Sequence, residues 1–148
     1  MKPDVDRFME VAAAHVVMRI APKLGPGYEQ SSMLVLMALL NSAREETERA
    51  ASRRVEENRE LRRIFAEAGP AVVDAALREG LDEAAAGEDT NFAISALERS
   101  NAGLRALLID LHAHIEELDS AEAREIDTQI WQELARSTER RKLVMGPY

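Results

Sequence analysis

Between Tyr28 and Ala68 the chain runs for 41 consecutive residues without a glycine or a proline. These are the two residues most unfavourable in a helix interior, so their absence predicts one very long helix over about 28–68. At a rise of roughly 1.5 Å per residue, such a helix is about 60 Å long. Because this length exceeds the diameter of a compact domain of this size, we expect part of the helix to project or to pack against a second copy of the chain.

Composition narrows the class of protein. The 148 residues suggest a single helical domain over 1–148, rich in residues that favour helices. The formal net charge of −8 argues against nucleic acid or an anionic membrane surface as a partner. The absence of cysteine excludes disulfides, thiol catalysis and Cys-ligated zinc, and fits a cytoplasmic location. The acidic N-terminus is unlike a signal peptide, and the longest apolar run has eight residues, too few to span a membrane.

Glycines, prolines and capping residues divide the chain into about five helices. The expected helices cover residues 4–24, 28–68, 70–86, 90–118 and 119 to shortly before Gly146. The candidate N-caps are Asp4, Asp89 or Thr90, and Asp119, which forms a capping-box pattern with Glu122. Because the sequence shows no strand pattern, the predicted fold class is all-α, an antiparallel helical bundle.

The two parts of the long helix differ in character. Residues 33–40 are apolar on every side, which predicts burial all round. Between Arg44 and Arg63, 13 of 20 residues are charged, which is typical of a solvated face.

The inward face of the charged part consists of small residues, namely Ala43, Thr47, Ala50 and Ala51. Small side chains leave room for another helix, so we expect a homodimer, antiparallel or crossed, formed by self-association through the long helix. The projecting part would then present Arg49, Arg53 and Arg54 to a protein partner, such as a metabolic enzyme.

A leucine stripe from Leu104 to Ile115 predicts the buried face of the fourth helix. Asn101 falls inside the same stripe. A polar residue in this position is typical of a feature that sets the register of helix pairing.

His15 and Arg19 are four residues apart on the apolar face of the first helix. Burying an unpaired cation costs several kcal/mol, so this pair predicts an acidic partner on another helix or an anionic ligand. The three interpretations are a structural ion pair at the rim of the bundle, a pocket for a carboxylate, phosphate or acyl group, and simple exposure to solvent.

His112 and His114 are two residues apart and point roughly 200° from each other on a helix, so they do not bind one ion together. Each has an acid four residues away, Glu116 for His112 and Asp110 for His114. We interpret both as residues at the boundary of the core.

Glu56, Glu57 and Glu60, followed after a gap by Glu79 and Asp82, form the order Glu-Glu-x-x-Glu and Glu-x-x-Asp. This pattern resembles the magnesium-binding signature of all-helical nucleotide pyrophosphohydrolases of the MazG type. Four carboxylates at one level of two antiparallel helices are suited to Mg²⁺, which prefers oxygen ligands. The helical periodicity opposes this reading, because it points Glu57 and Glu60 away from the apolar stripe of their own helix.

The segment from Arg19 to Gly25, the apolar helix over 34–40 and the sequence Ala43-Arg44-Glu45 resemble a family of small all-helical bacterial proteins of unknown function. The terminal Gly146-Pro147-Tyr148 is similar to the Asn-Pro-x-Tyr ending of that family. Its members are often encoded near acyl-CoA-dehydrogenase-like and phosphotransferase-like enzymes. The resemblance therefore implies an accessory role near acyl or phosphoryl metabolism and supplies no catalytic residues.

Together these patterns predict a non-catalytic helical interaction or accessory protein, with no cofactor. The alternatives are a magnesium-dependent nucleoside triphosphate pyrophosphohydrolase that uses Glu57, Glu60, Glu79 and Asp82, and a binder of small anionic ligands that uses His15 and Arg19.

Overall fold

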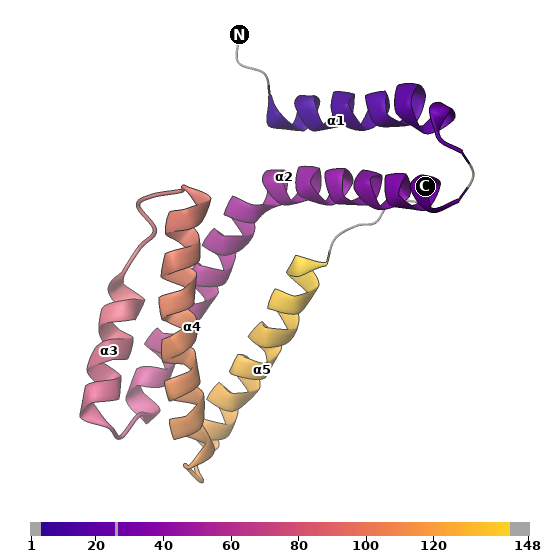
Figure 1. Cartoon of the computed structure of the whole chain (residues 1–148). Helices are drawn as coiled ribbons and strands as arrows, with labels where there is room; N and C mark the ends of the chain where they lie inside the picture. Colours follow the sequence, from indigo (N-terminus) through magenta and orange to yellow (C-terminus); the bar gives the residue numbers. More distant parts are fainter. Residues whose placement is uncertain (1–3, 26, 143–148) are drawn as a thin grey trace. The chain divides into compact units, whose positions relative to one another are not determined.

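The computed structural model describes residues 4–25 and 27–142, and all regular elements in these residues are helical (Figure 1). The α-helices are α1 (Val5–His15), α2 (Tyr28–Ala68), α3 (Ala75–Ala86), α4 (Ile94–Glu116) and α5 (Ala121–Arg141). The predicted all-α class and the bounds of the long helix are confirmed. None of the helices in the described residues combines the length and the hydropathy that a bilayer crossing requires. The helix boundaries expected at Pro26 and Gly146 fall outside the described residues.

Contacts divide the chain into two compact units, whose boundary lies between Ala50 and Ala51. The first unit contains α1 and the first part of α2. The second unit, residues 51–142, contains the rest of α2 together with α3, α4 and α5.

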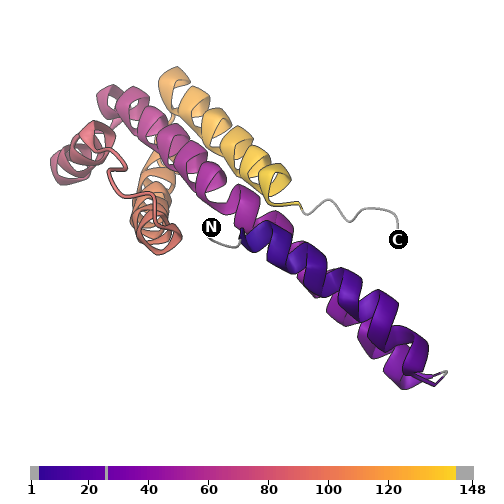
Figure 2. The same ribbon diagram turned by 90° about the horizontal axis from the view of Figure 1, so that it is seen from above.

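The second unit contains a continuous hydrophobic core. In Figure 1 its helices lie side by side, with α4 between α3 and α5, and Figure 2 shows α5 along the second part of α2. The buried core side chains are Leu61, Ile64, Phe65, Ala68, Val72, Leu81, Leu104, Leu108, Leu111, Ile115, Ala123, Ile126 and Ile130. The predicted leucine stripe of α4 is therefore buried as expected.

Side-chain caps fix where α3 and α5 begin. The Asp74 carboxylate accepts a hydrogen bond from the backbone amide three residues later at 2.9 Å, so α3 begins after Asp74 and not at Pro70. The Ser120 hydroxyl caps α5 in the same way at 3.0 Å. The predicted cap, Asp119, instead forms an ion pair with Arg124.

The first unit begins with a helix that changes its winding. Asp4 caps α1 as predicted, with a hydrogen bond of 3.4 Å from the Asp6 amide. After α1 the chain forms a π-helical turn at Val16–Ile20 and a 3₁₀ turn at Ala21–Lys23, so the expected single helix to about Leu24 is three successive helical segments. In Figure 1, α1 lies alongside the first part of α2.

Two local features connect α1 with α2, one at the turn and one at the far end of α1. Gly27, directly before α2, has a φ of 131°, a conformation that side chains with a Cβ rarely adopt. At the other end of α1, the Asp6 carboxylate accepts hydrogen bonds from the Arg44 guanidinium of α2.

The exposure of α2 differs from what its composition predicts. In the apolar stretch 33–40, four side chains are exposed by 41–64%, namely Leu34, Val35, Leu36 and Leu39. In the charged stretch, Arg53, Glu57 and Asn58 are 7%, 1% and 0% exposed. Within one chain the apolar stretch is therefore not buried all round, and the charged stretch combines these buried side chains with a solvated face that includes Glu46, Glu48, Glu56 and Arg59.

The reason lies in the neighbours of each stretch. Within the described residues of the first unit, α1 is the one helix alongside residues 33–40, and one helix covers only one side of another. The charged stretch meets side chains of opposite charge from α4 and α5, which permit the burial of part of it.

We expect Phe65→Ala to lower the free energy of unfolding by about 3–5 kcal/mol, because Phe65 is 0% exposed in the core. Urea unfolding followed by circular dichroism measures the change. The matched control is Phe92→Ala, since Phe92 is 63% exposed. Equal effects of the two substitutions would contradict the placement of the core.

Candidate functional site

A buried carboxylate, that of Glu57 in α2, is at the centre of a polar cluster in the second unit. From α5, Arg141 donates to its two oxygens at 3.0 and 2.8 Å, and the Ser137 hydroxyl donates at 2.9 Å. From α4, the Asn101 amide donates at 3.3 Å, and the Arg105 guanidinium lies 3.6 Å away. Side chains of two other helices therefore neutralise the negative charge that α2 carries at this position.

These partners determine the ionisation of Glu57. Burial raises the pKa of the carboxyl, but the hydrogen bonds from Arg141 and Ser137 and the positive charges of Arg141 and Arg105 outweigh it. The net result is a pKa lowered from 4.5 to about 2. Glu57 is therefore an ionised, fully partnered carboxylate at neutral pH.

Two asparagines extend the cluster to a second carboxylate. The Asn101 amide donates to the Asn58 side-chain oxygen at 2.9 Å, and the Asn58 amide donates to Asp89 at 2.9 Å. Asp89 also accepts hydrogen bonds from Arg62 at 3.2 and 3.0 Å and from Ser100 at 3.0 Å. Burial raises the pKa of Asp89, but the hydrogen bonds from Arg62, Asn58 and Ser100 outweigh this effect, so its pKa lies below the usual value. Asp89 is thus part of this cluster, and its prediction as the cap of α4 is wrong.

The cluster is structural in character. Its central side chains, those of Glu57, Asn58 and Asn101, are at most 2% exposed, so a substrate has no access to them. The carboxylates bind guanidinium and amide groups, which leaves them unsuited to act as a general base. The prediction that Asn101 lies in the buried stripe is confirmed, and its hydrogen bonds show what it pairs with.

The four predicted magnesium ligands do not gather at one place. The Glu57 carboxylate is enclosed by its partners, so the predicted orientation away from the core is wrong for this residue. Glu60 pairs with Arg63 at 3.1 Å, while Glu79 and Asp82 are exposed on α3. Among the described residues, these four carboxylates form no group with ligand atoms close enough to share an ion.

His15 and Arg19 are both exposed. The π-helical turn begins directly after His15, so the α-helix on which the pairing was predicted ends before Arg19. The apolar face that they were expected to share is also exposed, since Phe8 is 66% exposed. Neither residue forms an ion pair with another described residue, and the expected acidic partner is not seen there.

The three arginines of the predicted partner surface are not equally accessible. Arg53 is 7% exposed, and the Arg54 side chain is 16% exposed and pairs with Glu98 of α4. The predicted exposure of these two residues is therefore wrong. Arg49 is half-buried and pairs with Glu45 within α2.

The two histidines of α4 have separate environments, as their spacing predicts. The Nε2 atom of His114 accepts a hydrogen bond from the Val73 amide at 3.2 Å. The Nε2 atom of His112 lies 2.8 Å from an Asp127 oxygen on α5 and 3.7 Å from Glu116, which confirms the expected proximity of Glu116.

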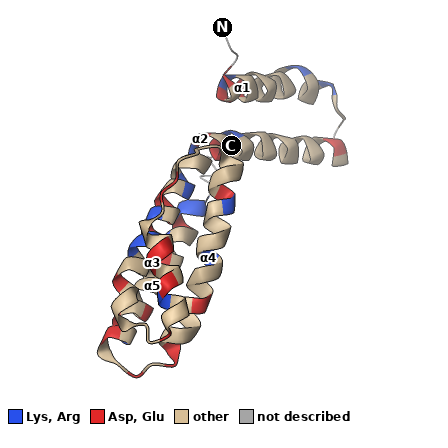
Figure 3. Ribbon diagram, turned by 90° about the vertical axis from the view of Figure 1, so that its left-hand side faces the viewer, with Lys and Arg blue, Asp and Glu red and all other residues tan. Residues whose placement is uncertain are grey.

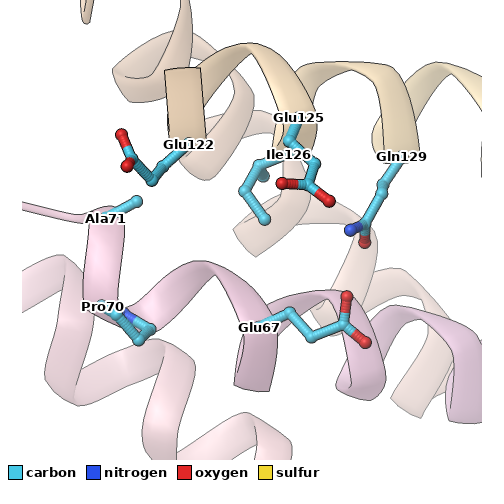
Figure 4. A pocket seen from close by; sticks show the side chains of 7 residues that line it. All are labelled: Glu67, Pro70, Ala71, Glu122, Glu125, Ile126 and Gln129. Atoms are coloured by element: carbon cyan, nitrogen blue, oxygen red, sulfur yellow. The ribbon is translucent and has the colours of Figure 1, made fainter. Parts of the chain in front are cut away.

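A pocket of about 260 Å³ lies between the end of α2 and α5 (Figure 4). Figure 4 shows carboxylates on both sides, from Glu122 and Glu125 on α5 and from Glu67 on α2, with the Gln129 amide beside Glu67. The remaining lining residues are Pro70, Ala71 and Ile126. This lining consists mainly of carboxylates and does not by itself indicate a particular reaction.

The candidate functional surface is in the first unit. Eleven large hydrophobic side chains there are more than a third exposed, and we call them the N-terminal apolar surface: Val5, Phe8, Val11, Val17, Met18, Ile20, Tyr28, Leu34, Val35, Leu36 and Leu39. The buried hydrophobic residues of the same unit are Ala13, Val16 and Ala50, and all three are small or medium-sized. In Figure 3 uncharged residues occupy most of α1 and of the first part of α2.

Comparison with protein-family models, with curated proteins and with solved structures finds no match to this chain. The resemblances to a small helical bacterial family and to the MazG type therefore stay predictions.

We expect Glu57 to make the second unit sensitive to acid. A carboxyl whose pKa is lowered on folding stabilises the protein above its unfolded pKa, near 4.5, and this contribution is lost as the pH falls toward 2. The shift corresponds to about 3 kcal/mol. Glu57→Gln should therefore reduce stability at pH 7 and flatten its decline between about pH 5 and 3, as measured by urea unfolding.

The matched control is Glu79→Gln, which changes an exposed carboxylate and should leave the decline with pH as in the unsubstituted protein. If Glu57→Gln retained the full decline, the buried ion pair would not be the source of the acid sensitivity.

Proposed function

We propose that this chain is a non-catalytic helical interaction or accessory protein that forms a homodimer through the N-terminal apolar surface. The observation that carries the proposal is the uneven distribution of exposed hydrophobic side chains. Eleven of the 16 large exposed hydrophobics lie in the first unit, although that unit contributes only 46 of the 138 described residues. Exposed apolar patches of this kind mark interaction sites.

The arrangement of the first unit favours a second copy as the occupant. Two helices share only one face, so a hairpin of α1 and the first part of α2 leaves most of its apolar side chains exposed. Two such hairpins make the four helices of a bundle, which has an interior that these side chains can fill. A symmetric dimer requires no additional complementary surface, because the same patch serves both copies.

The spacing of the exposed residues fits this arrangement. On α2, Leu36 and Leu39 are three residues apart and therefore lie on neighbouring turns of one side, and both are exposed. On α1, Phe8 and Val11 have the same spacing and are also exposed. Each helix thus offers an apolar stripe to a partner helix.

Two points support the accessory role: the predicted family resemblance, and the fact that the predicted magnesium ligands do not converge among the described residues. The buried carboxylates are partnered by arginines, and the predicted magnesium ligands are dispersed, so no observation favours the pyrophosphohydrolase alternative. A cytoplasmic location is part of the proposal because the chain has no cysteine to protect from a reducing environment.

The dimer is tested by sedimentation velocity and light scattering at high micromolar concentration. We expect a species with twice the 16.5 kDa mass of the chain. Leu39→Glu introduces the same negative charge from both copies into the interface, so the two chains should repel each other. We expect the dissociation constant of the dimer to rise at least about tenfold, which corresponds to about 1.4 kcal/mol or more.

The matched control is Ile109→Glu, which introduces the same charge at an exposed apolar residue of α4 in the second unit. This variant should keep the dimer. A monomer at high micromolar concentration, or equal weakening by both substitutions, would exclude dimerisation through this surface.

A further inference from the structure

Three potential metal ligands from two helices meet at the surface of the second unit. His112 and Glu116 are one turn apart on α4, and Asp127 faces them from α5. The His112 Nε2 atom lies 2.8 Å from the Asp127 oxygen and 3.7 Å from the Glu116 oxygen, and all three atoms lie within 4.8 Å of one another.

A His–Asp ion pair would account for only part of this arrangement. Glu116 is 63% exposed and has the freedom to point into solvent, yet its carboxylate lies within reach of the same imidazole nitrogen. On the other side, Trp131 packs its ring edge-to-face against His112, with the ring centroids 5.4 Å apart. The indole therefore limits the orientation of the imidazole and keeps Nε2 directed at the two carboxylates.

We propose that His112, Glu116 and Asp127 bind one divalent transition-metal ion of the zinc type. In a tetrahedral site with bonds of about 2.0–2.1 Å, the donor atoms are roughly 3.4 Å apart. The present separations of 2.8 and 3.7 Å bracket this value, so small side-chain rotations are enough. One imidazole and two carboxylates favour zinc, cobalt or nickel over magnesium, which prefers oxygen ligands alone.

The position of the site suggests its effect on the protein. Glu116 is the last residue of α4. Asp127 lies in the second turn of α5, after the short connection between the two helices. A bound ion would link the two helices and stabilise the folded state, because the unfolded chain does not hold these three ligands together. A water molecule would complete the coordination on the exposed side.

The test uses the full chain without an affinity tag. Calorimetric titration with Zn²⁺ should show one site per chain, and Co²⁺ should give the visible absorption of a four-coordinate ion. Zn²⁺ should also raise the thermal unfolding temperature. Glu116→Gln and Asp127→Asn should each weaken Zn²⁺ binding by at least about tenfold, as even outer-shell changes at metal sites commonly do.

The controls separate this site from adventitious binding. Glu117→Gln changes the neighbouring exposed carboxylate, and His15→Gln changes a histidine of the first unit, so both variants should bind Zn²⁺ like the unsubstituted protein. Circular dichroism without metal checks that each variant folds. The proposal is overturned if folded Glu116→Gln and Asp127→Asn bind Zn²⁺ unchanged, if His15→Gln abolishes binding, or if no binding occurs at millimolar Zn²⁺.

Discussion

The second unit depends on the neutralisation of one buried negative charge. An ionised carboxylate at the position of Glu57 would cost several kcal/mol if it were unpaired, so the fold requires donors at the same level of the bundle. Arg141 and Ser137 supply them from α5, and Asn101 supplies one from α4. A leucine core tolerates small sliding of helices, whereas hydrogen bonds of about 3 Å do not. The polar cluster therefore fixes the register in which the apolar core packs.

The features that follow from local rules were predictable from the sequence. The long helix has the expected bounds because glycine and proline act on the backbone of their own segment. The leucine stripe of α4 and the buried position of Asn101 followed from helical periodicity alone. The orientation of Glu57 was predicted wrongly, although Glu57 lies one turn before Leu61 and two turns before Phe65 and therefore on the face of that stripe. The partner of this carboxylate was not predictable from periodicity, because Arg141 lies 84 residues later on another helix. Periodicity also has no means of placing Asp127 beside His112, since the two residues lie on different helices.

The two units divide the hydrophobic side chains unequally, and this division follows from the number of helices in each. Four helices enclose an interior, so the second unit buries residues such as Phe65 and Leu111 completely. Two helices enclose none, so the first unit leaves Leu34 and Leu39 more than half exposed. A segment that is apolar on every side therefore stays partly exposed when the chain itself supplies only one neighbouring helix.

The long helix gives the first unit a support that a separate hairpin would lack. Nucleation is the unfavourable step in helix formation, and further residues then add to an existing helix at little cost. The second unit holds residues 51–68 of α2 in helical form through its core, so a nucleus is always present. No glycine or proline interrupts the helix between Tyr28 and this nucleus. The apolar side chains over 33–40 therefore lie on a formed helix, so the partner that we propose would not have to supply the ordering of the backbone.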